Sequence, residues 1–104
     1  SSRVTLVSGI TSDDITEIYP FLKTIQYDDF FKKHIIAIRK KSAKDYFFEV
    51  RGRDFVVHLG EISYIDIKLS NYKVFYSKAL EYNKLDQYKR IDLQFGNQVV
   101  CTIK

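Results

Sequence analysis

Apolar and polar residues alternate near the end of the chain, in the run Arg90-Ile91-Asp92-Leu93-Gln94-Phe95. A period of two residues is typical of a strand that is buried on one face. Gly96 and Asn97 come next, and both residue types tolerate the positive φ angles of a tight turn. The pattern therefore predicts a C-terminal hairpin, with a strand over residues 88–95 and a return strand over residues 98–104.

The register of this hairpin depends on the length of its turn. A two-residue connection pairs Phe95 with Gln98 and places the apolar residues of the two strands on opposite faces. A three-residue connection keeps one face apolar, and for this reason we favour it. It predicts three pairs: Phe95 with Val99, Leu93 with Cys101, and Ile91 with Ile103.

Earlier segments show strand and helix periods in turn. Residues 3–7 are prone to form a strand, and residues 15–25 carry apolar side chains at helical spacing. Pro20 lies inside that helical pattern and lacks a backbone N–H, so we expect two short helical segments around it. Asp28 is a suitable cap for a further turn with Phe30 and Phe31 in the core.

The middle of the chain alternates between strands and a long helix. Residues 35–40, 46–50 and 55–59 are strand candidates joined by short polar links, which predicts an antiparallel meander. Residues 64–82 return to helical spacing, with Ser63 as the expected N-cap. The sequence therefore predicts one α+β domain over residues 1–104, with an antiparallel sheet, helices packed on one face and a C-terminal edge hairpin.

The composition narrows the classes of function. The net charge of +4 is mild and its lysines and arginines are scattered, so nucleic-acid binding is allowed but not indicated. Cys101 is the single cysteine, which excludes an intramolecular disulfide, and we expect it to be a small buried residue. His34 and His58 fit no catalytic motif and are more simply structural. We therefore expect no enzyme activity, no cofactor, no metal ion and no nucleic-acid partner.

The last strand has nothing after it in the sequence that could cover it. A strand in that position is a candidate sheet edge with unpaired backbone N–H and C=O groups. Such an edge can take up a strand from a partner protein. The sequence therefore directs attention to residues 98–104 as an interaction site.

At this hairpin the chain also resembles a known family, the FtsQ/DivIB bacterial cell-division proteins in their Bacteroidetes-type form. The resemblance covers nearly the whole chain and depends on the order and spacing of several motifs. These are Val7-x-Gly9, Asp29-Phe30-Phe31-Lys32, Gly60-Glu61-Ile62, Phe75-Tyr76-x-Lys78-x-Leu80 and Tyr88-Lys89-x-Ile91-Asp92-Leu93-x-Phe95-x-Asn97-Gln98-Val99-Val100-Cys101-Thr102.

The resemblance implies a non-enzymatic scaffold of the divisome that recruits FtsB-like and FtsL-like proteins. Family members have a cytoplasmic tail, one transmembrane helix, a POTRA domain and a β domain outside the membrane. This chain would be most of the β domain, without the anchor, the POTRA domain and the first strands. Its place would be the periplasmic face of the inner membrane at the division septum, and a POTRA-like or other peptide-binding module of an envelope assembly is the alternative.

In the family the last strand is the docking edge for FtsB, which implies partner-binding residues here. Carried over by position, these are Tyr88, Arg90, Gln94, Gln98, Val99, Val100, Cys101, Thr102, Ile103 and Lys104. A proline in an added-strand interface removes a backbone donor. We therefore expect Val100→Pro to abolish partner binding while the domain stays folded.

Overall fold

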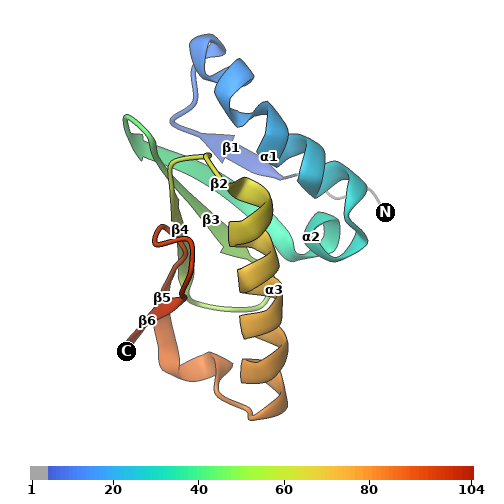
Figure 1. Ribbon diagram of the computed structural model, residues 1–104, viewed down its shortest axis with the longest axis vertical. Coiled ribbons are helices and arrows are strands. Elements are labelled where there is room, and N and C mark those ends of the chain that lie inside the picture. The colour runs from blue at the N-terminus through green and yellow to red at the C-terminus, as the bar shows by residue number, and fades with distance from the viewer. Residues whose placement is uncertain (1–4) are drawn as a thin grey trace.

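The computed structural model describes residues 5–104, which form a single sheet and three α-helices (Figure 1). Short 3₁₀ turns at Ser12–Asp14 and Leu85–Gln87 precede α1 and β5. In chain order the main elements are β1 (Leu6–Ser8), α1 (Ile15–Tyr27), α2 (Asp29–His34), β2 (Ile35–Ser42), β3 (Asp45–Val50), β4 (Val56–Gly60), α3 (Ile65–Glu81), β5 (Tyr88–Asp92) and β6 (Val100–Ile103).

The six strands lie in the sheet in the same order as in the sequence, from β1 to β6. The α+β class is confirmed, and so are the antiparallel β2–β3–β4 meander and the antiparallel β5–β6 hairpin. The expectation of a wholly antiparallel sheet is wrong, because β1 pairs with β2 and β4 pairs with β5 in parallel. In both places a helical connection carries the chain back to its starting end of the sheet, which makes the next strand parallel.

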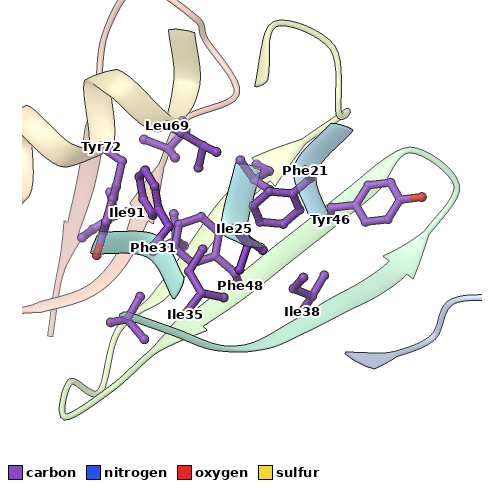
Figure 2. Packing of buried hydrophobic residues seen from close by; sticks show 14 of the residues in the cluster. Phe21, Ile25, Phe31, Ile35, Ile38, Tyr46, Phe48, Leu69, Tyr72 and Ile91 are labelled. Atoms are coloured by element: carbon purple, nitrogen blue, oxygen red, sulfur yellow. The ribbon is translucent and has the colours of Figure 1, made fainter. Parts of the chain in front are cut away.

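The core lies between the sheet and the helices, which cover one face of it (Figure 1). Phe48 of β3 is fully buried at its centre, with its ring centroid 6.0 Å from that of Phe21 on α1 and 5.4 Å from that of Tyr72 on α3. Figure 2 shows these three side chains within the core. Each such side chain contributes about 1.5–3 kcal/mol through burial, so the contacts fix both helices on the sheet.

The helix α1 runs without interruption from Ile15 to Tyr27, with Pro20 inside it. The expected division into two short segments is therefore wrong. Ile18, Phe21 and Ile25 are buried on both sides of the proline, and their contacts with the core offset the backbone hydrogen bond that Pro20 cannot make. Pro20 itself is exposed.

The ends of the other elements follow the predictions in part. Asp28 caps α2 as expected, since its carboxylate accepts a hydrogen bond from the Phe31 N–H at 3.0 Å. Ser63 does not cap α3; Tyr64 takes the N-cap position with a left-handed backbone (φ 57°) and makes no capping bond through its side chain. The predicted strand over residues 3–7 is confirmed at Leu6 and Val7, whereas Arg3 and Val4 lie outside the described residues.

Candidate functional site: the C-terminal edge of the sheet

Within residues 5–104, the strand β6 is the outermost strand of the sheet on its C-terminal side and pairs only with β5. The prediction that the last strand forms a sheet edge is therefore confirmed (Figure 1). The opposite edge is β1, which pairs with β2.

The register of the hairpin differs from the expected one. Ile91 pairs with Cys101, and Asp92 pairs with Val100. The structure thus pairs Ile91 two positions earlier along β6 than the predicted Ile103. Because the shift is an even number of residues, the side chains stay on the faces that the sequence predicted.

Leu93 is the cause of this shift. Its N–H donates a hydrogen bond to the His58 carbonyl oxygen at 2.8 Å, and its side chain is buried. Leu93 is therefore held against β4, so β5 ends at Asp92 and residues 93–99 form a longer connection than a tight turn. Within this connection the Gly96 carbonyl oxygen accepts a hydrogen bond from Asn71 Nδ2 of α3 at 2.7 Å.

Two backbone hydrogen bonds determine which groups of β6 point outward. The Lys104 N–H donates to the Gln87 carbonyl oxygen at 2.9 Å, so Lys104 faces the side of β5. The bond from Leu93 to His58 directs Leu93 toward β4, so its neighbour Asp92 faces β6 and the paired residue Val100 faces β5. Successive residues of a strand point their N–H and C=O groups to alternate sides. Val100 and Thr102 therefore complete the ladder to β5.

Cys101 and Ile103 consequently carry the outward N–H and C=O groups of the edge. The Cys101 side chain packs against the core cluster and is half-buried, and burial raises the pKa of its thiol. Ile103 and Val100 are both exposed. The edge therefore offers free backbone groups together with apolar side chains on both of its faces.

The other predicted site residues belong to β5, to the connection before β6 and to the end of the chain. The Tyr88 ring packs against Phe75 of α3, with ring centroids 5.5 Å apart. Gln94, Gln98 and Val99 belong to the connection before β6, and Lys104 Nζ lies 3.2 Å from an Asp54 carboxylate oxygen. Arg90 is paired with Thr102 in the hairpin, but its guanidinium belongs to a different group of side chains.

That group lies on the face of the sheet away from the helices and was not predicted as a unit. His58 Nε2 lies 2.5 Å from an Asp45 carboxylate oxygen, and its Nδ1 lies 2.9 Å from Asp92 Oδ1. Arg90 Nη2 approaches the same Nδ1 at 2.8 Å and donates to Asp92 at 3.2 Å. The group joins β3, β4 and β5 near the end of β5, where the chain leaves the sheet for the connection to β6.

Phe47 packs against these side chains and is only 5% exposed, although it does not belong to the core cluster. Its ring stacks on His58 with centroids 4.4 Å apart, and Lys41 Nζ lies 4.5 Å from the ring centroid. The Arg90 guanidinium lies 5.4 Å from the same ring. The available signal in the sequence was strand alternation, which places Phe47, His58 and Arg90 on one face.

The second histidine, His34, is buried in the helical layer. Its Nε2 lies 2.5 Å from the Tyr72 hydroxyl oxygen, and its ring stacks on Phe30 with centroids 4.6 Å apart. Burial, with a smaller effect of the Arg53 charge, lowers the pKa of His34 to about 4. These contacts give His34 a packing role.

Across residues 5–104, none of the helices has the length and apolar character needed to cross a membrane. In the same described part of the chain, histidine, cysteine and acidic side chains form no group of three or more suited to a metal ion.

Comparison with known proteins identifies the chain by family. Residues 1–102 match the family model described as FtsQ/DivIB, C-terminal related. No curated protein matches the chain.

Proposed function

Because this chain belongs to the FtsQ/DivIB, C-terminal related family, we propose that it recruits a partner to the bacterial divisome by adding a strand to β6. Family membership confirms the resemblance seen in the sequence and implies a role in cell division. The family is generally non-enzymatic, and the proposed role is that of an interaction domain. The proposed partners are an FtsB-like protein and, together with it, an FtsL-like protein.

The observation that carries the proposal is the outward direction of the Cys101 and Ile103 backbone groups. Two residues that each present an N–H and a C=O group can make up to about four main-chain hydrogen bonds with an added strand. Each such bond contributes about 0.5–1.5 kcal/mol net. The edge thus has enough backbone capacity to hold a short partner strand.

Side chains beside these groups would select the partner sequence. On one face, Cys101 and Ile103 offer an apolar surface next to the core, and on the other face Val100 and Thr102 flank Arg90. A partner strand would therefore place apolar residues on the helix-bearing side. The preceding residues Gln98 and Val99 extend the same surface.

We further propose the family's location for this domain, the periplasmic face of the inner membrane at the division septum. In this arrangement a single N-terminal membrane helix anchors the full-length protein. The β6 edge would then meet the extracytoplasmic parts of its partners.

The orientation of the backbone changes the choice of test variant. Val100 faces β5, so Val100→Pro would break the ladder inside the domain rather than the free edge. The expectation that this substitution leaves the domain folded is therefore replaced. Cys101→Pro removes an outward N–H, which is the position where an edge strand tolerates proline.

The test is an NMR titration of the domain with the extracytoplasmic segment of the FtsB-like protein from the same organism. Amide shifts in wild type should concentrate at residues 98–104. Cys101→Pro should lower the affinity at least about tenfold, whereas Cys101→Ala, which keeps the N–H, should bind like wild type. Wild-type affinity in a folded Cys101→Pro domain would overturn strand addition at β6.

A further inference from the structure

A cavity of about 810 Å³ lies at the end of the sheet where α3 begins. Three connections surround it: the β2–β3 turn, the segment between β4 and α3, and the connection between β5 and β6. No residue of β6 lines the cavity, so the cavity is a distinct feature of the domain.

Three large apolar side chains that the core does not use line the cavity. Tyr64 is 75% exposed, Ile67 is 53% exposed and Phe95 is 50% exposed. Ile67 cannot reach the core, because Leu69 and Tyr72 already occupy the buried side of α3. The exposure of three such residues around one hollow is a typical feature of a binding surface.

The cavity also contains a buried cation. Lys68 is 3% exposed, and its Nζ donates to the carbonyl oxygens of Leu59 at 3.0 Å and Glu61 at 2.7 Å. An ammonium group has three donors, so one N–H is left without an acceptor among the contacts of the described residues. Within residues 5–104, no carboxylate forms an ion pair with Lys68. Burial lowers the pKa of this ammonium, and the charge of Glu61 opposes the change.

The carboxylates that line the cavity form no ion pair with Lys68, although the charge of Glu61 partly offsets the effect of burial. Asp45 is engaged by His58 Nε2 at 2.5 Å, and the Glu61 carboxylate lies near the Ser63 hydroxyl at 3.4 Å. Lys44 adds a second cation to the lining. A buried charge without a direct ion pair is unfavourable, so an anionic group that enters the cavity could pair with the Lys68 ammonium.

The walls of the cavity are already in place. Asn71 Nδ2 donates a hydrogen bond to the Gly96 carbonyl oxygen at 2.7 Å. Tyr64 and Gly60, which also line the cavity, take left-handed backbone conformations. A bulky residue with positive φ is uncommon and is found where the surrounding structure enforces it. A ligand would therefore meet a preformed site.

We propose that this cavity binds a carboxylate that carries a large apolar group. The carboxylate accepts the third N–H of Lys68, and the apolar group packs against Tyr64, Ile67 and Phe95. Two sources share this chemistry: the C-terminus of a peptide that ends in a large apolar residue, and a free organic acid. The binding is independent of strand addition at β6.

The test is a titration of the 104-residue domain, followed by amide NMR, with N-acetyl-phenylalanine and with its uncharged amide. The acid should bind saturably at concentrations up to about 10 mM, with shifts at Gly60, Asn71 and Gly96. The amide should bind at least about tenfold more weakly. Equal affinity for the acid and the amide, or no saturation, would overturn the proposal.

Matched variants locate the binding. Ile67→Ser should weaken binding of the acid about tenfold, whereas Val74→Ser, equally exposed on α3 but outside the cavity lining, should not change it. Lys68→Met should remove the preference for the acid over the amide. Equal effects of the Ile67 and Val74 substitutions would contradict the site.

A tighter complex with N-acetyl-phenylalanine than with 3-phenylpropanoate supports a peptide C-terminus as the natural ligand, and equal affinity supports a free acid.

Discussion

Leu93 donates its backbone N–H to the carbonyl oxygen of His58 at 2.8 Å, and this bond determines which backbone groups of β6 point outward. By holding Leu93 against β4, it directs Asp92 toward β6 and therefore turns Val100 inward. Cys101 and Ile103 then point their backbone groups outward. The interior of the sheet thus decides which residues of β6 present outward backbone groups.

Hydrogen exchange provides a direct check of this alternation. In the free domain the amides of Cys101 and Ile103 should exchange fast, because they point away from β5, whereas those of Val100 and Thr102 should be protected by β5. Addition of the FtsB-like segment should slow exchange at Cys101 and Ile103. Protection of Cys101 in the free domain would show that the assignment of the two sides is wrong.

The central core position should carry a large share of the stability. Phe48→Ala removes a ring in contact with both Phe21 and Tyr72, so we expect a loss of about 3–5 kcal/mol in the free energy of unfolding, measured by urea denaturation. Phe95→Ala, at a half-exposed ring outside the core cluster, should cost less than about 1 kcal/mol. Similar losses for the two variants would contradict the placement of the core.

Side-chain alternation was enough to predict the strands, the meander and the edge position of the last strand. The parallel pairs were missed because local periodicity does not show on which side a helical connection returns the chain. The register of the β5–β6 hairpin was missed for a related reason. Leu93 is held by a hydrogen bond to the carbonyl oxygen of His58, and His58 is remote from it in sequence. Lys68 lies among apolar positions of α3, and only the carbonyl groups of Leu59 and Glu61 show why a lysine is buried there.

The charged group beneath the hairpin should stabilise the domain through His58. His58→Ala leaves the Asp45 and Asp92 carboxylates without their shared partner and uncovers the Phe47 ring, so we expect a loss of about 2–4 kcal/mol in urea denaturation. Glu49→Ala is the control. It breaks a half-exposed pair with Arg39 on the same face and should cost less than about 1 kcal/mol. If His58→Ala costs no more than Glu49→Ala, the group around His58 does not stabilise the domain more than an ordinary surface ion pair does.

The stability of the domain should fall in mild acid because of His34. Burial, followed by the Arg53 charge, lowers the pKa of His34 to about 4, whereas in the unfolded chain it is near 6.5. The unfolded state therefore binds more protons between these values, and the free energy of unfolding decreases as the pH falls through this range.

The size of this effect can be isolated with one variant. Between pH 7 and pH 4 the contribution of His34 should fall by about 2–3 kcal/mol, measured as the difference between wild type and His34→Gln in urea denaturation. The glutamine keeps a polar group near the Tyr72 hydroxyl but does not titrate, so the other acidic groups cancel in the comparison. Parallel pH profiles for the two proteins would mean that His34 is protonated in the folded domain as readily as in the unfolded chain, which its burial beside Phe30 and Tyr72 opposes.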